Sequence, residues 1–151
     1  LTNEDWIWIF LSIMLSAILT MVLIFVAKNS IAHFAPQPDR LLINSIEPEK
    51  TWVLLAWIPL FLFNLISEEF FWRGYLFPRQ QEKFKKYTWL FNGFLWLLFR
   101  LPMGLTFLLI SVPTALLTTF AFQKTQNLKV AIIINGTISG IGFLAIALGY
   151  L

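Results

Sequence analysis

The feature that most constrains the fold of this chain is a series of long stretches that contain no charged residue. The first covers residues 6–27, which is 22 residues. A helix of about 20 apolar residues is long enough to cross the hydrocarbon core of a bilayer. Four more uncharged stretches follow, over residues 51–67, 88–99, 101–123 and 130–151. These stretches predict an integral membrane protein that crosses the bilayer several times.

The composition supports a membrane location and excludes several kinds of site. Charged residues make up 13% of the chain, about half of the ~25% that is typical of soluble proteins, and the mean hydropathy is +0.75. The 16 Phe and 7 Trp residues suit contact with lipid and with the membrane interface. The chain has no Cys and a single His, His33, which excludes disulfides, iron–sulfur clusters, thiol nucleophiles and multi-histidine metal sites. We therefore expect no metal and no cofactor.

The continuous uncharged stretches predict an all-α fold, a polytopic transmembrane helical bundle of about five membrane helices. Every backbone group in lipid needs a partner within the protein, and a helix supplies it locally, whereas a β-barrel would need alternating segments of ~10 residues. The helix over residues 88–99 is too short to span the bilayer alone. We interpret residues 1–151 as a single membrane domain. Residues 1–50 form the first helix and a polar connector, and residues 51–151 form a core that carries the motifs described below.

Proline and acidic residues predict where the second membrane helix begins and ends. Pro48 lies between Glu47 and Glu49. Proline is favoured in the first turn of a helix, and acids are favourable near the positive end of its dipole, so this triplet predicts a helix start. Pro78 predicts the end of the same helix. Residues 80–86 would then form a polar, basic loop.

The distribution of basic residues predicts how the chain is oriented in the membrane. Residues 79–86 contain four of them: Arg79, Lys83, Lys85 and Lys86. Lys124 and Lys129 fall on the same side of the membrane, two helices later. The positive-inside rule predicts that this side is cytoplasmic, with the 79–86 loop at the anionic headgroups. Because such loops account for the net charge of +3, we expect the lipid bilayer, and no nucleic acid, as a partner.

Three charged residues interrupt the second helix: Glu68, Glu69 and Arg73. Each would cost about 2.5–3.5 kcal/mol at the centre of a membrane helix. One interpretation is that the helix end reaches the headgroups and Arg73 extends toward them. The spacing offers another, because Glu69 and Arg73 are four residues apart in the order that favours an ion pair. Glu68 lies about 100° around the helix, where it suits either a general base or a pair with a cation from another helix.

Three motifs resemble one known family. Residues 67–74, SEEFFWRG, resemble the EExxxR(G) signature of the CPBP family, the CAAX-protease and bacteriocin-processing membrane proteins, also called the Abi family. Residues 92–102, NGFLWLLFRLP, resemble its second motif, in which an aromatic residue is followed four residues later by His and then by Leu-Pro. Residues 131–139, AIIINGTIS, resemble its third motif, in which His is followed four residues later by Asn. The resemblance covers roughly residues 52–150 and implies the fold of an intramembrane protease.

The resemblance assigns a role to each residue of the first motif. In active members of the family, the first Glu of the pair activates a water molecule that attacks a peptide carbonyl. Glu68 is at that position, and Glu69 with Arg73 corresponds to the pair that orients it. Two histidines and an asparagine complete the family's site, as oxyanion stabilisers or, in another view, as metal ligands.

The second and third motifs depart from the family pattern. Trp96 is the aromatic residue of the second motif, and Arg100 stands where its His would be. In the third motif Asn135 stands in place of His, and Ser139 in place of Asn. Both motif histidines are therefore replaced. His33 precedes the motif region, so it can substitute for at most one of them.

These replacements favour a structural role over catalysis. A catalytic zinc site has three N, O or S ligands and an open coordination position. Two carboxylates beside two cations do not provide such a ligand set. We expect a closed polar network of Glu68 and Glu69 with Arg73, Arg100 and Asn135. The protein would then be a catalytically degenerate, protease-like subunit whose partners are other membrane-protein subunits. The alternative is an active intramembrane glutamic endopeptidase that cleaves prenylated or membrane-bound peptides, in which Arg and Asn donate hydrogen bonds to the oxyanion.

The last uncharged stretch also contains two glycines at a spacing that affects helix packing. Gly136 and Gly140 form a GxxxG pattern, which lets two membrane helices approach closely. This pattern predicts tight helix packing within the bundle.

Overall fold

The computed structural model describes residues 1–30 and 52–147, and within these ranges the chain is helical and contains no strand. The elements in chain order are α1 (Asn3–Ser30), α2 (Val53–Glu69), the π-helix η3 (Phe70–Leu76), α3 (Phe77–Phe84), the 3₁₀ turn η4 (Lys85–Tyr87), α4 (Thr88–Phe99), the 3₁₀ turn η5 (Leu101–Met103), α5 (Leu105–Thr125) and α6 (Leu128–Ala147). The expected all-α fold is confirmed.

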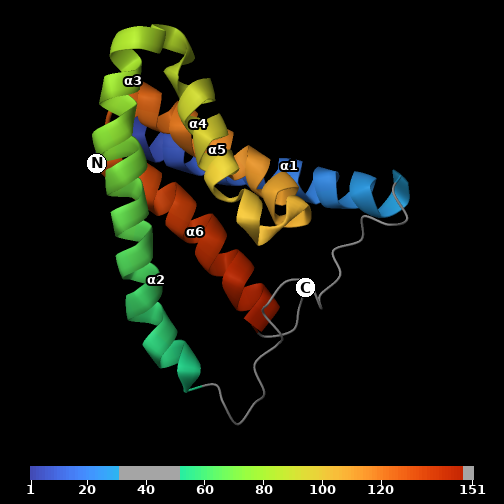
Figure 1. Cartoon of the computed structure of the whole chain (residues 1–151). Helices are drawn as coiled ribbons and strands as arrows, with labels where there is room; N and C mark the ends of the chain where they lie inside the picture. The colour runs from blue at the N-terminus through green and yellow to red at the C-terminus, as the bar shows by residue number, and fades with distance from the viewer. Residues whose placement is uncertain (31–51, 148–151) are drawn as a thin grey trace.

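The helices are long and apolar enough for a multi-pass membrane protein. Four helical stretches of the described residues meet that standard, Asn3–Val26, Val53–Phe99, Phe107–Thr125 and Leu128–Ala145. The second of these turns back at η4, so that α2, η3 and α3 form one arm and α4 returns beside it (Figure 1). The described residues thus contain four stretches that are long and apolar enough to cross a membrane, one fewer than the about five membrane helices expected from the sequence, because α4 belongs to the second stretch. The protein is an integral membrane protein that sits in a lipid bilayer.

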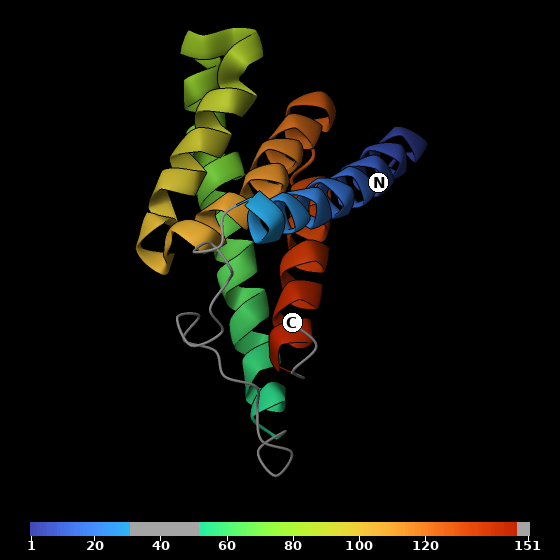
Figure 2. The same ribbon diagram turned by 90° about the vertical axis from the view of Figure 1, so that its right-hand side faces the viewer.

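Helix α5 lies at the centre of the bundle and packs against α1, α4 and α6, while α2 packs against α6 (Figures 1 and 2). One apolar cluster joins α1, α5 and α6 through Ile9, Ala121, Val130 and Ile134. A second joins η3, α4 and α5 through Trp72, Trp96, Leu97 and Ala115. Most large apolar side chains of α1 and α2 are exposed, which is the pattern expected where lipid is the surrounding solvent.

Helix α4 is short for a membrane helix. Its 12 residues extend about 18 Å, compared with a hydrocarbon core of ~30 Å. The chain then turns through η5 and returns in α5, whose far end lies beside the start of α4: Gln123 Nε2 donates to the Lys86 carbonyl, and the Trp89 N–H donates to Gln123 Oε1. Helix α4 alone is therefore shorter than the hydrocarbon core, and Arg100 follows its last residue, at the end away from Lys86.

The prediction that Pro78 ends the second helix is wrong. The helical path continues through Pro78 to Phe84, and residues 80–84 are helical rather than part of a loop. The π-helix explains this, because the backbone changes register where the Phe77 N–H donates to the carbonyl of Trp72, five residues back. Pro78 thereby becomes a first-turn residue of α3, where a missing N–H is tolerated. The expected helix start at Pro48 lies outside the described residues.

Gly136 and Gly140 lie where α6 packs against α2. A Cβ atom built on Gly136 would be 2.7 Å from Leu65 Cδ2, and one built on Gly140 would be 3.5 Å from Phe61 Cζ. A Cβ atom built on Gly142, further along the same helix, would have no neighbour within 4 Å. A side chain at Gly136 would thus force the buried Leu65 side chain to move.

We predict that Gly136→Ala destabilises the bundle relative to Gly142→Ala. Both changes add the same helix propensity, about 1 kcal/mol in favour of alanine, so the difference between them isolates the contact with Leu65. Overpacking typically costs about 1–3 kcal/mol, which sets the expected difference in the free energy of unfolding. Equilibrium unfolding in mixed micelles measures it. Equal stabilities of the two variants would contradict the importance of the close contact.

Candidate functional site

The seven residues predicted from the three motifs lie close together at the centre of the bundle. Glu68 and Glu69 end α2, Arg73 is in η3, Trp96 and Arg100 come from α4 and its end, and Asn135 and Ser139 come from α6. Their side chains form two ion pairs that share a tryptophan. We call Glu68 with Arg100 the outer pair and Glu69 with Arg73 the inner pair.

The outer pair joins two helices that are distant in sequence. Arg100 Nη2 donates to both carboxylate oxygens of Glu68, at 3.1 Å to Oε1 and 3.2 Å to Oε2. Trp96 Nε1 also donates to Glu68 Oε1. The Arg100 guanidinium carbon lies 4.0 Å from the centroid of the Trp96 ring. Each side chain of the outer pair is 13% exposed, so this pair lies at the edge of the buried site.

The inner pair is completely buried. Arg73 Nη1 donates to Glu69 Oε1 at 3.1 Å, and both side chains are 0% exposed. Asn135 Nδ2 donates to the same carboxylate oxygen at 2.7 Å, and the Ser139 hydroxyl donates to Asn135 Oδ1 at 2.9 Å. The four residues form one chain of hydrogen bonds from η3 through α2 to α6.

A residue that no motif indicated completes the surroundings of Arg73. Arg73 Nη2 donates to Thr119 Oγ1 at 3.0 Å, and the Thr119 hydroxyl donates to the Ala115 carbonyl within α5 at 2.7 Å. The Arg73 guanidinium carbon also lies 5.0 Å from the Trp96 ring centroid. Trp96 is 0% exposed and contacts a cation of each pair. The inner pair is thereby tied to α5 and, through Trp96, to the outer pair.

The π-helix that carries Arg73 is held by Asn92, the first residue of the second motif, to which the sequence analysis assigned no role. Its side-chain amide donates to the Trp72 carbonyl at 3.0 Å and to Gln80 Oε1 at 2.8 Å. Asn92 is fully buried on α4. Short π-helical segments often occur at functional sites, because the wider turn re-aims side chains. Asn92 thus positions the backbone of the segment from which Arg73 extends.

The residues of the site do not fit a metal ion. Within the described ranges, no group of three or more His, Cys, Asp or Glu residues lies close enough to hold one. Each of the two carboxylates is paired with a guanidinium, Glu68 with Arg100 and Glu69 with Arg73, so the site does not offer the three ligands that a catalytic zinc ion needs. His33 lies outside the described residues.

The fold and the carboxylate cluster define a polytopic membrane protein of the CAAX-protease-like class. Residues 50–141 match the family model described as type II CAAX prenyl endopeptidase Rce1-like. The match covers more than half of the chain, so this protein belongs to the Rce1-like family. The resemblance to the CPBP family read from the motifs is confirmed. Neither the curated proteins nor the solved structures gave a significant match.

Proposed function

We propose that this Rce1-like protein is catalytically degenerate and acts as a structural, assembly or interaction subunit in a membrane. The observation that carries this proposal is the binding of Glu68 by its neighbours. Arg100 donates to both of its oxygens and Trp96 to one of them. A general base must reach the proton that it abstracts, and charge-assisted hydrogen bonds of this kind are strong. Both oxygens of Glu68 therefore already accept hydrogen bonds, which opposes its use as a base that activates water.

The inner pair also supports a structural role, because its hydrogen bonds link several helices. Glu69, Arg73, Asn135 and Thr119 connect α2, η3, α6 and α5 through buried hydrogen bonds. Such a cluster pairs each intramembrane charge with an opposite one, which lowers the cost of burying it, and it connects the helices that contribute its residues. A bundle held in this way retains the shape of a protease core without its chemistry, and that shape is what a partner subunit would bind.

The second candidate is an active glutamic endopeptidase that cleaves prenylated or membrane-bound peptides with Glu68 as general base. The observation that favours it is the 13% exposure of the outer pair. A rotation of the Arg100 side chain away from Glu68 would free the carboxylate on the side that is open. Arg100 and Asn135 are then the donors available to an oxyanion.

A cleavage assay distinguishes the two functions. The purified chain is reconstituted in lipid nanodiscs with a prenylated CAAX peptide, and release of the peptide's C-terminal fragment is followed. We expect no release above that of a Glu68→Gln variant. Unfolding in mixed micelles serves as the control that both proteins are folded. Cleavage by the wild type that is lost in a folded Glu68→Gln variant would establish the active endopeptidase and overturn the proposal.

We also propose that the tip of the long helical arm, residues 79–86, is cytoplasmic. Its basic residues lie at the same end of the bundle as Lys124, because Gln123 contacts Lys86. The chain contains no Cys, so Glu82→Cys introduces a single label on an exposed residue. A maleimide that does not cross membranes is expected to label this variant in inside-out vesicles and not in intact cells. Labelling in intact cells would mean that residues 79–86 lie outside the cell and would contradict the proposed orientation.

A further inference from the structure

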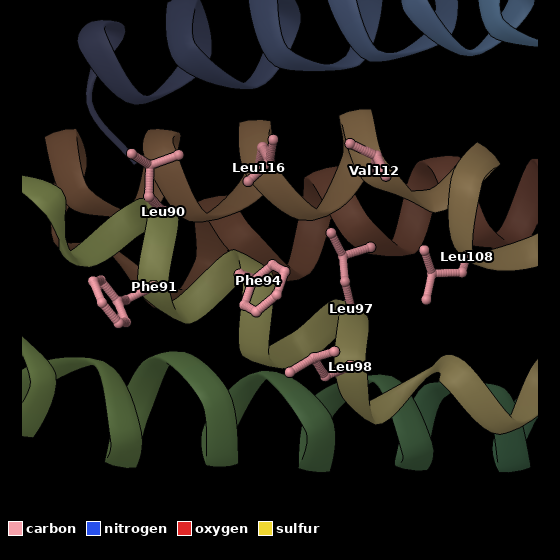
Figure 3. A pocket seen from close by; sticks show the side chains of 8 residues that line it. All are labelled: Leu90, Phe91, Phe94, Leu97, Leu98, Leu108, Val112 and Leu116. Atoms are coloured by element: carbon pink, nitrogen blue, oxygen red, sulfur yellow. The ribbon is translucent and has the colours of Figure 1, made fainter. Parts of the chain in front are cut away.

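A groove lies between α4 and α5 on the outer surface of the bundle (Figure 3). It has a volume of ≈ 520 Å³, and every residue that lines it has an apolar side chain. Leu90, Phe91, Phe94, Leu97 and Leu98 line it from α4, and Leu108, Val112 and Leu116 line it from α5. The groove contains none of the ion-pair residues of the site described above. Its chemistry suits a hydrocarbon chain.

The dimensions of the groove match one leaflet of a bilayer. On α4 it extends from Leu90 to Leu98, which is about 12 Å along a helix. Half of a ~30 Å hydrocarbon core is about 15 Å. Tyr87, next to the start of α4, is exposed, and aromatic residues at this position mark the membrane interface. With Tyr87 at the interface, the groove extends over the length of about one leaflet.

The end of the groove nearest the interface is positively charged. Lys85 and Lys86 are exposed and precede Leu90 by about one helical turn. The carbonyl of Lys86 is bound by Gln123, so the end of α5 with the exposed Lys124 lies beside the same turn. Across residues 79–86 four basic residues face a single acid, Glu82. A negatively charged headgroup would meet an excess of cations here.

We propose that the α4–α5 groove binds one acyl chain of an anionic phospholipid whose headgroup contacts Lys85 and Lys86. The apolar lining, the one-leaflet length and the basic end each match one part of such a lipid. A neutral phospholipid would fill the groove without using the lysines. The proposal is independent of whether Glu68 is catalytically active, because the groove and the carboxylate cluster share no residue.

Lipid retention tests the proposal on the whole chain. The protein is purified from nanodiscs that contain equal amounts of phosphatidylglycerol and phosphatidylcholine, and bound lipid is counted by native mass spectrometry. Polybasic membrane contacts contribute about 1 kcal/mol per lysine, which is about a fivefold effect for each. We therefore expect phosphatidylglycerol to be enriched at least about fivefold. Equal retention of the two lipids would overturn the proposal.

Two variants separate the headgroup contact from the chain contact. Lys85→Gln with Lys86→Gln is expected to abolish the enrichment, whereas Lys129→Gln, at an exposed lysine on α6, is expected to preserve it. Leu98→Trp fills the groove from an exposed position and is expected to abolish retention. Its matched control is Leu55→Trp on the exposed face of α2. Retention by Leu98→Trp that equals that of its control would mean surface attraction only and would overturn the groove as the site.

Cross-linking of the unaltered protein guards against variants that fail to fold. Phosphatidylglycerol with a photoactivatable group in its acyl chain is added, and adducts are mapped by mass spectrometry. Adducts on residues 90–98 or 108–116 are expected. Adducts confined to other helices would overturn the proposal, as would loss of the adducts when an isoprenoid chain is added at equal concentration, because the groove would then prefer a prenyl group.

Discussion

Replacement of Arg73 with methionine is expected to lower the free energy of unfolding by about 3–5 kcal/mol. Arg73 and Glu69 are both 0% exposed, so the change leaves a carboxylate buried without its cation. It also removes the donor to Thr119. Loss of one partner of a buried pair is costly because the remaining charge has neither water nor a counter-ion.

Two further variants identify the reason for the loss. Arg79→Met removes an exposed guanidinium that lies over the Tyr75 ring, and it is expected to change the stability by less than about 1 kcal/mol. Glu69→Leu combined with Arg73→Met removes both buried charges, and it is expected to recover a large part of the loss. Unfolding in mixed micelles provides all three values. If Arg73→Met is no less stable than Arg79→Met, the inner pair does not stabilise the bundle.

Truncation of Trp96 is expected to have a comparable effect, for a different reason. Trp96 is 0% exposed and packs with Trp72, Leu97 and Ala115, so Trp96→Ala opens a cavity and is expected to cost about 3–5 kcal/mol. It also removes the hydrogen bond to Glu68 and the ring that the two guanidinium groups contact.

Trp96→Phe separates these contributions. The phenyl ring keeps a face for the cations but has no N–H, so this variant loses chiefly a hydrogen bond to a charged group, worth about 1.5–3 kcal/mol. Trp52→Ala, at a residue that is 66% exposed just before α2, controls for the removal of a large aromatic side chain. We expect Trp52→Ala to be the most stable of the three variants, Trp96→Phe to be intermediate and Trp96→Ala to be the least stable. If Trp96→Ala is as stable as Trp52→Ala, the Trp96 ring does not stabilise the bundle.

The amino-acid sequence predicts most of the fold because the chain must satisfy its backbone inside lipid. Long uncharged stretches leave few alternatives to helices, and the expected all-α fold is confirmed. The end of the second helix is not at Pro78, since the rule for proline assumes an α-helical register before it. The preceding π-helix changes that register, and no periodicity in the apolar residues reveals it.

The site also contains residues that the sequence predicts and one that it does not. Glu69 and Arg73 are four residues apart on a continuous helical path, so their spacing alone indicates that they form a pair. The motifs bring Glu68, Arg100 and Asn135 into consideration, and the structure places Arg100 on Glu68 and Asn135 on Glu69. Thr119 could not be predicted, because its helix carries none of the motifs. Its role exists only through the packing of α5 against η3.

The continuous helical path from α2 to α3 also determines how long this arm of the protein is. From Val53 to Phe84 the chain has 17, 7 and 8 helical residues in succession. At about 1.5 Å per residue this arm is roughly 45 Å long, comparable to the full ~40–45 Å thickness of a bilayer with its headgroups. An arm that stopped at Pro78 would have ended about 10 Å sooner. The extra two turns place the exposed Glu82 and Lys83 beyond Pro78, so the arm presents charged side chains at a point that a helix ending at Pro78 would not reach.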